Sequence, residues 1–273
     1  MNAVKLERIG PAPRIAVNHA GAGPLVVFLH GIGGNKTNWR DQVPIFAEHF
    51  HAVAWDARGY GDSDDYEGPL RYQDFADDLV RVIDHFGAKR AHLVGLSMGG
   101  SIIQEFHSRH AGRIASMTLC DTRATFGTAP SQDASADFIR LRLKPLQEGK
   151  EPRDIAPTVA KSLVAPDAPP EILQRLIDSI AALHKDSYMK TLLARGTWKC
   201  SFDPRTVTVP TLVVCGSEDR LTPPSASQEL ADGIAGAKLA LIPGAGHLSN
   251  IEKPDEFNRV VLAFLRGIAV RGA

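Results

Sequence analysis

A glycine-rich hexapeptide, GLSMGG at residues 95–100, constrains the fold of this chain more than any other segment. It follows an apolar run at 91–94 and precedes a helix-like segment at 102–110. A serine in a sharp turn between a strand and a helix is pushed out above the sheet, and the flanking glycines leave room where the backbones crowd. The first N–H groups of such a helix favour a negative charge beside the serine. The pattern indicates a nucleophilic Ser97 or, alternatively, a tight turn around a buried, hydrogen-bonded serine.

A second glycine-rich turn, HGIGG at residues 30–34, follows an apolar, strand-like run. It resembles the H-G-x-G loop of α/β-hydrolases, in which one loop N–H and the N–H after the nucleophile stabilise an oxyanion. By position, the resemblance implies Ile32 and Met98 as the two donors. Gly31 and Gly33 would lie beside the bound substrate, since they let the main chain approach its carbonyl group.

Two turns near the C-terminus contain the other candidate catalytic residues. An apolar run leads into an acidic turn that contains Asp219, and a later one leads into His247. The chain order Ser97, Asp219, His247 is the order of the catalytic residues in α/β-hydrolases, where the acid orients the imidazole and the imidazole takes the serine proton. Asp121, which follows another strand-like run at the same edge of the sheet, is the rival acid. The other alternative is that Asp219 is only a turn residue.

These three segments resemble the α/β-hydrolase family in residue type and order, and the resemblance covers essentially the whole chain. It implies an α/β fold with a mostly parallel eight-stranded sheet, helices on both faces and a helical cap, and the alternation of strand-like and helix-like runs agrees with it. We expect a core domain of residues 1–123 and 206–273, which begins with an antiparallel hairpin. Residues 124–205 should form the cap, where apolar spacing predicts helices near 138–146 and 172–183.

Three polar residues near these motifs are expected to be structural. His30 ends a strand-like run, where a histidine is more often a fixed hydrogen-bonding residue than a catalytic base. Asp56 and Arg58 lie in DARGYGDS, residues 56–63, which resembles a turn of the same family. The resemblance implies that this pair braces a loop.

The similarity extends to 3-oxoadipate enol-lactonases in LTPP at 221–224, in GHLSNIE at 246–252 and in the GLSMGG motif. It implies a serine hydrolase of the carboxylic ester class that opens a lactone through an acyl-enzyme, in the degradation of aromatic compounds. The predicted cap and the DTR segment at 121–123 differ from the enol-lactonase pattern. We therefore expect a lactone or carboxylic ester as the substrate, rather than that one lactone.

An anionic lactone would require a cationic side chain in the pocket. Arg123 is the leading candidate because it follows the end of a strand-like run and should lie near Ser97. Other cations near or in the predicted cap are Arg140, Arg142, Lys190 and Arg195. For each of them the alternative is a solvated position on a helix surface.

Other functions remain open on these motifs. A carbon–carbon bond hydrolase of aromatic ring-fission products would use the same triad and a similar cap. A general carboxylesterase or a cofactor-free perhydrolase would share the serine turn. A ligand receptor on a hydrolase scaffold would bind without appreciable turnover, which an intact triad disfavours.

Charge and composition limit the kinds of partner that the protein is expected to bind. Lys and Arg total 31 and so do Asp and Glu, so the net charge is zero and no global field would attract nucleic acid or an anionic membrane. The N-terminal residues show no apolar leader, and no apolar run approaches the roughly 20 residues that span a bilayer. We expect a cytoplasmic protein that acts on a small-molecule ester or lactone, with a homodimer left open.

Neither a metal nor a cofactor is expected. The chain lacks a C-x-x-C pair, an H-E-x-x-H helix and a G-x-G-x-x-G turn after a strand. Three cysteines cannot all pair, and two of them end buried strand-like runs, so we expect no disulfide.

Overall fold

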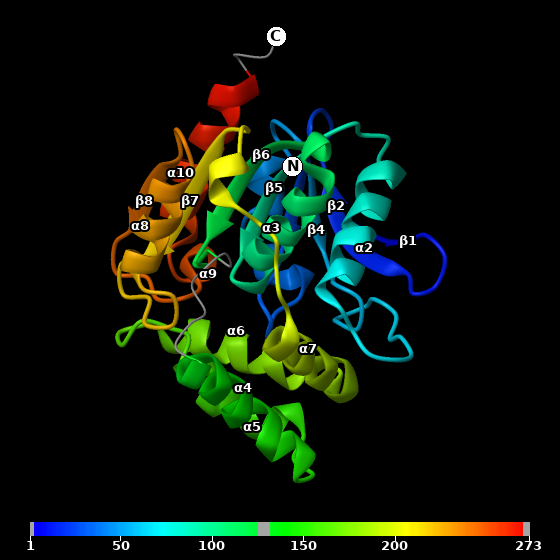
Figure 1. The fold of residues 1–273 in the computed structure, drawn as a ribbon, viewed down its shortest axis with the longest axis vertical. Helices are drawn as coiled ribbons and strands as arrows, with labels where there is room; N and C mark the ends of the chain where they lie inside the picture. The colour runs from blue at the N-terminus through cyan, green and yellow to red at the C-terminus, as the bar shows by residue number, and fades with distance from the viewer. Residues whose placement is uncertain (1–2, 125–131, 270–273) are drawn as a thin grey trace.

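A single eight-stranded sheet forms the centre of the computed structural model, which describes residues 3–124 and 132–269. The strand order is β1-β2-β4-β3-β5-β6-β7-β8 (Figure 1). Strand β2 runs antiparallel to β1 and β4, and all other neighbouring strands pair in parallel. The strands are β1 (Lys5–Ile9), β2 (Ile15–Ala20), β3 (Leu25–Leu29), β4 (His51–Trp55), β5 (Ala91–Leu96), β6 (Ile114–Cys120), β7 (Thr211–Gly216) and β8 (Lys238–Ile242). The predicted sheet and its N-terminal hairpin are confirmed.

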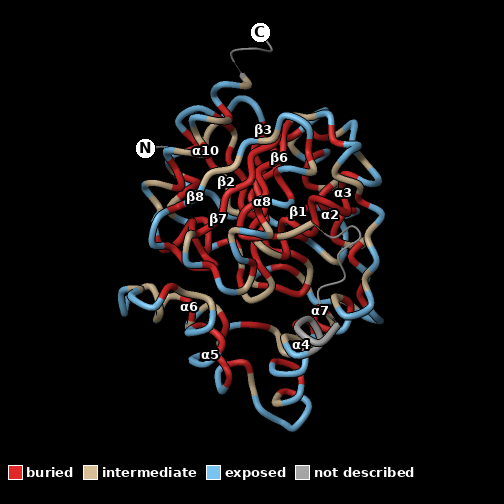
Figure 2. The backbone as a smooth tube through the Cα atoms, turned by 60° about the vertical axis from the view of Figure 1, so that its left-hand side comes forward, coloured by how far each residue is buried: buried red, intermediate tan, exposed pale blue. Residues whose placement is uncertain are grey.

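The central strands are apolar throughout because helices cover the sheet on both faces. Every residue of β3 (LVVFL) is buried, as expected of a parallel strand with no face toward water. Phe28 packs against Phe46 and Trp39 on one face, and the next residue, Leu29, contacts Gly99 on the other. Figure 2 shows the buried residues gathered in the strands of the sheet.

The helices fall into two sets. Those beside the sheet are α1 (Val43–Phe46), α2 (Tyr72–His85), α3 (Met98–His110), α8 (Pro224–Gly233), α9 (Ser249–Glu252) and α10 (Pro254–Ala269), with short 3-10 turns η1 (Lys36–Trp39), η2 (Ala111–Arg113) and η3 (Pro204–Thr206). The others form an insertion between β6 and β7, made of α4 (Gln132–Gln147), α5 (Pro152–Lys161), α6 (Pro170–Ala181) and α7 (Lys185–Thr197). We call these four helices and their connections the helical insertion.

The helical insertion lies below the carboxyl ends of β6 and β7 (Figure 1). The helices expected near 138–146 and 172–183 correspond to α4 and α6, and the structure adds α5 and α7. Residues 125–131, at the start of the predicted cap, lie outside the described residues. The turns that follow parallel strands therefore face the insertion.

Ion pairs hold the loop after β4. Asp56 is buried and accepts hydrogen bonds from the Lys36 ammonium group at 2.7 Å and from the Asp62 N–H at 2.8 Å. Arg58 pairs with the buried Asp78 of α2 at 2.6 Å. Asp56 and Arg58 thus both brace this loop, each through its own partner rather than through one another.

Candidate active site

Ser97 occupies a strained turn between β5 and α3. Its φ of 52° and ψ of −107° lie where few residues other than glycine are found. A Cβ atom on Gly99 would lie 2.2 Å from the Leu29 carbonyl oxygen, and one on Gly95 would lie 2.5 Å from the backbone of Gly99. The Ser97 N–H donates to the Cys120 carbonyl at 2.8 Å, which ties the turn to β6. Contacts with two neighbouring strands therefore maintain the strain.

The loop after β3 approaches the serine turn. Gly31 lies closest, and a Cβ atom built on it would be 3.5 Å from the Ser97 Cβ atom. His30 Nδ1 donates to the Gly31 carbonyl at 2.8 Å, and its Nε2 accepts from the Ala57 N–H at 3.0 Å. Burial lowers the pKa of His30, so the ring stays neutral in these two bonds. The structure gives His30 the structural role expected of it, as the support of the loop that carries Ile32.

His247 and Asp219 form a hydrogen-bonded pair. The Asp219 Oδ2 atom lies 2.8 Å from His247 Nδ1, and both side chains are almost fully buried. The same carboxylate accepts hydrogen bonds from the N–H groups of Leu221 and Thr222 at 2.8 and 2.9 Å, and from the Thr222 hydroxyl at 2.7 Å. Burial opposes ionisation of Asp219, but the charge of His247 and these donors hold the pKa of the carboxyl below its usual value. In a neutral His247 whose Nδ1 donates to Asp219, the lone pair of the ring lies on Nε2.

Asp121 lies beside this pair without bonding to the imidazole. It follows β6 with a φ of 46° and is fully buried. Its carboxylate accepts hydrogen bonds from the Gly216 N–H at 2.8 Å and from the Ser249 hydroxyl at 2.6 Å. Burial, and then the charge on Asp219, raise the pKa of Asp121 to about 7. Of the two rival acids, Asp219 is therefore the one that contacts His247.

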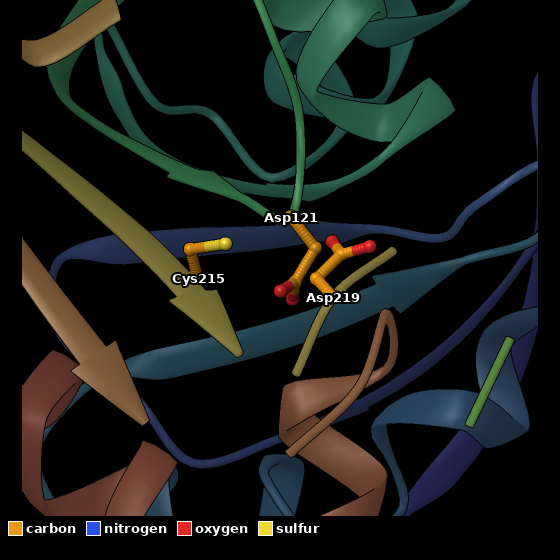
Figure 3. Close-up of side chains that lie close together, drawn as sticks. All are labelled: Asp121, Cys215 and Asp219. Carbon is orange, nitrogen blue, oxygen red and sulfur yellow. The ribbon is translucent and has the colours of Figure 1, made fainter. Parts of the chain in front are cut away.

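Asp121, Asp219 and Cys215 form a close cluster (Figure 3). Their ligand atoms lie within 4.8 Å of one another, which is near enough for a metal ion. Both carboxylates already accept hydrogen bonds from the protein, and burial raises the pKa of the Cys215 thiol to about 12. A protonated thiol is a poor metal ligand, so this donor set suits the joining of β6 to β7 better than the binding of a cation.

The insertion bonds directly to residues 243–248, the loop between β8 and α9 that carries His247, which we call the histidine loop. The His247 N–H donates to the carbonyl of Leu163, in the connection between α5 and α6, at 2.8 Å. Glu252 of α9 accepts hydrogen bonds from the N–H groups of Ala165, Gly246 and Leu248 at 2.8, 3.0 and 3.2 Å. One carboxylate therefore joins the insertion to both sides of His247.

Ser97 and His247 line a pocket between the core and the insertion. Most of its wall is apolar and comes from both the core and the insertion, which is typical of small-molecule sites. Its lining residues are Gly31, Ile32, Gly33, Gly34, Asn38, Leu96, Ser97, Leu221, His247 and Leu248 of the core, and Phe138, Arg142, Val159, Leu163, Leu176, Ile180 and Tyr188 of the insertion. The structure thus brings together Ser97, His247, Ile32, Gly31 and Gly33, as the sequence predicts.

Met98 and Asp219 are not among the residues that line the pocket. Met98 is the first residue of α3, so its N–H has no acceptor within the helix and lies next to Ser97. Its side chain is buried in the core. Asp219 contacts two lining residues, His247 and the N–H group of Leu221.

Arg123 is not among the residues that line the pocket. Its guanidinium donates to the Leu221 carbonyl at 2.8 Å. Arg142 of α4 lines the pocket instead. Its spacing of four residues from Phe138, another lining residue, was a usable signal, because residues at i and i+4 share a helix face.

Comparison with known families identifies the class of protein. The alpha/beta hydrolase fold family matches residues 24–254, which is most of the chain. The protein therefore belongs to the α/β-hydrolase family, as the order of its motifs predicts. Among the described residues, no helix combines the length and apolar character needed to cross a membrane.

The names of the particular relatives give different substrates. The chain is 28% identical to 3-oxoadipate enol-lactonase 2 of Acinetobacter baylyi over 262 residues, 93% of this chain and 95% of the relative. It is also 28% identical to the 2-hydroxy-6-oxononadienedioate/2-hydroxy-6-oxononatrienedioate hydrolase of Klebsiella pneumoniae over 270 residues, 94% of this chain and 92% of the relative. The predicted similarity to enol-lactonases is confirmed at modest identity.

Solved structures agree over nearly the full length. A thermophilic esterase from Thermogutta terrifontis superposes with a TM-score of 0.87 at 27% identity, covering 97% of this chain and 99% of the esterase. The enol-lactonase from Burkholderia xenovorans LB400 superposes with a TM-score of 0.82 at 27% identity, covering 96% of this chain and all of the relative. This chain is therefore a hydrolase whose bond specificity must be argued from its own site.

Proposed function

We propose that this protein is a serine hydrolase that opens a lactone or cleaves a carboxylic ester through Ser97, His247 and Asp219. The observation that carries the proposal is the hydrogen bond of 2.8 Å between Asp219 and His247, in the same pocket as the strained Ser97. The similarity to enol-lactonases and to an esterase supports this class of bond. Of these two similarities, the one to enol-lactonases favours a lactone from the degradation of aromatic compounds as the physiological substrate.

The proposed reaction begins with attack of the Ser97 hydroxyl oxygen on the substrate carbonyl, while His247 Nε2 takes the hydroxyl proton. The N–H groups of Ile32 and Met98 stabilise the resulting oxyanion, and each such donor is worth about 3 kcal/mol of barrier. His247 then returns the proton to the leaving alkoxide, which in a lactone stays attached to the acyl chain. A water molecule, activated by the same imidazole, releases the acid and restores Ser97.

The helical insertion is proposed to act as a cap domain over this site. We assign residues 124–205 to the cap, and residues 1–123 and 206–273 to the core domain. The insertion provides Val159, Leu163, Leu176 and Ile180 to the pocket wall. An apolar roof excludes bulk water and strengthens the hydrogen bonds that form in the transition state.

Labelling with a fluorophosphonate tests the assignment of the nucleophile. The reagent should modify Ser97 alone, as mapped by peptide mass spectrometry, and the Ser97→Ala variant should remain unlabelled. Triad members act as a unit, so Ser97→Ala and His247→Ala should each lower turnover of p-nitrophenyl butyrate by about a millionfold, with no further loss in the double variant. Near-normal turnover in a folded Ser97→Ala variant would contradict the proposal.

Carbon–carbon bond hydrolysis is the second candidate, and the similarity to the Klebsiella pneumoniae hydrolase favours it. Comparing kcat/KM for simple lactones with that for a vinylogous diketone from aromatic ring fission separates the two. Faster cleavage of the diketone would replace the first proposal with the second. Many turnovers per Ser97 on either substrate would exclude a receptor that only binds.

A further inference from the structure

One cation in the pocket has no anionic partner among the described residues. Arg142 of α4 lines the same pocket as Ser97 and His247, and only 7% of the residue is exposed. A buried guanidinium is costly unless it is paired, because it has lost its hydration. An unpaired one in a ligand pocket therefore needs an explanation.

Among the described residues, the hydrogen bonds and the ring contact of Arg142 are all with neutral groups. Its Nη1 donates to the Phe138 carbonyl at 3.2 Å and its Nη2 to the Ser162 hydroxyl at 3.4 Å. The Tyr188 hydroxyl lies within hydrogen-bonding reach, and the guanidinium carbon stands 3.7 Å from the centre of the Phe138 ring. The Nε atom is buried with no partner. These contacts hold the group in place but leave its charge without a counter-ion.

Three other cations with largely buried side chains each have a carboxylate partner. Lys36, Arg58 and Arg175, whose side chains are 6%, 16% and 11% exposed, pair with Asp56, Asp78 and Asp41. Arg142 instead has another cation, Arg195, as its charged neighbour, and burial lowers its pKa. Among the described residues, Arg142 therefore lacks the carboxylate partner that those three cations have.

We propose that Arg142 binds a carboxylate carried by the substrate, so that the site prefers an acidic ester or lactone over a neutral one. This inference rests on the proposed hydrolase function and assigns the acid-binding role to Arg142 rather than to Arg123. The guanidinium presents a planar fork that matches a carboxylate. The aliphatic residues of the same pocket favour a hydrocarbon segment between the carboxylate and the carbonyl group.

The test uses two substrates that differ only in charge. Mono-p-nitrophenyl glutarate carries a free carboxylate, and its methyl ester has the same chain without the charge. We expect the wild type to favour the acid by about ten to a hundredfold in kcat/KM, since a desolvated ion pair contributes one to a few kcal/mol. The succinate, adipate and pimelate analogues should show one preferred chain length, because Ser97 and Arg142 lie on separate parts of the structure.

Arg142→Met keeps the bulk of the side chain and removes its charge. The preference for the acid should fall to within about threefold of unity, whereas Arg142→Lys should retain part of it. The ratio of the two kcat/KM values is the readout, because a general packing defect would slow both substrates alike. Arg140→Met is the matched control: it removes the same charge from the same helix at a side chain that is 60% exposed and pairs with Asp137, so the ratio should not change.

Failure of this inference can be told apart from failure of the proposed function. If the wild type hydrolyses both esters equally, or if Arg142→Met keeps the full preference, Arg142 only packs α4 against Ser162 and the inference is overturned while the hydrolase stands. If neither ester is cleaved, titration calorimetry with glutarate decides the matter. Binding that is lost in Arg142→Met supports the carboxylate site, and equal binding, or none, overturns it.

Discussion

At the scale of single residues, the two aspartates near His247 have different hydrogen-bond partners. Asp219 bonds to the imidazole, whereas Asp121 bonds to the Gly216 N–H and to the Ser249 hydroxyl. Asp121 therefore joins the end of β7, which packs against Ala245 and Gly246, to Ser249, which follows His247 at the start of α9. Its contribution to turnover is indirect, through the position of the histidine loop.

Asparagine substitutions separate these two roles. Asp219→Asn removes the acceptor that selects the His247 tautomer, so kcat should fall by about four orders of magnitude. Asp121→Asn leaves the imidazole bonded to Asp219 and should lower kcat by less than about tenfold, in line with the loss of a hydrogen bond. Steady-state kinetics on one activated ester measures both. A larger kcat loss for Asp121→Asn would reverse the assignment.

Asp121 also makes the stability depend on pH. Because its pKa is raised in the folded protein to about 7, the native state holds a proton that the unfolded chain releases near its ordinary value of 3.8. The unfolded state thus binds fewer protons between these values, and the free energy of unfolding should decrease from about pH 4 to pH 7 on account of this group. Asn cannot ionise, so the stability of Asp121→Asn relative to wild type should rise across that range.

Urea denaturation at several pH values measures this difference. The exposed Asp167 provides a control, because Asp167→Asn should follow the wild-type curve at every pH. A constant difference between Asp121→Asn and wild type from pH 4 to pH 8 would mean that Asp121 is ionised throughout.

At the scale of elements, the junction of β5 with α3 has the least room for change. Gly99 lies in the first turn of α3, where an added Cβ atom would meet the Leu29 carbonyl at 2.2 Å. Neither the strand backbone nor the helix can yield without moving Ser97. Glycine is required here by the close approach of two elements.

Gly99→Ala should therefore reduce the free energy of unfolding by about 3 kcal/mol or more, as overpacking against backbone does. Gly267→Ala is the matched control. Nothing lies within 4 Å of a Cβ at Gly267 in α10, so alanine should be neutral or stabilising by up to about 1 kcal/mol. Urea denaturation followed by circular dichroism compares the two, and equal stabilities would contradict the close contact.

The elements that sequence predicts best are those specified by local pattern. The apolar runs and glycine turns around Ser97, Asp219 and His247 identify the parallel strands and their order, because buried strands and strained turns need those residues locally. In the insertion, α4 and α6 were predicted and α5 and α7 were not. Helix α5 does bury apolar residues at helical spacing, but Pro157 lies inside it and interrupts the pattern. The spacing of four residues places Arg142 and Phe138 on one face of α4, but whether that face meets the pocket depends on how α4 packs against α5 and α7.

At the scale of the whole molecule, the core and the insertion meet through Glu252. Its carboxylate accepts N–H groups from both parts, and charge-assisted bonds of this kind are stronger than neutral ones. Glu252→Gln removes the charge and replaces one acceptor oxygen with a donor. The stability should fall by about 2 kcal/mol, since a buried N–H is left unsatisfied. Turnover should fall as well, because His247 lies between two of these bonds.

Glu256→Gln is the control for this change. Glu256 is a partly exposed residue of α10 that pairs with Arg259 at the surface, so its substitution should leave the stability nearly unchanged and kcat unchanged. Thermal unfolding and steady-state kinetics on both variants give the comparison. Equal stability and equal kcat for Glu252→Gln and Glu256→Gln would show that the bonds of Glu252 contribute nothing to either.

The bond from the His247 N–H to the Leu163 carbonyl has a consequence for engineering. Replacing the insertion with that of a related hydrolase is a direct way to alter specificity, because most of the apolar pocket wall would change at once. The graft must still supply a carbonyl acceptor for His247 and an N–H donor for Glu252, since both groups come from the connection between α5 and α6. A chimera that retains residues 163–165 of this chain should keep its turnover, and one that replaces them should lose it even when it folds.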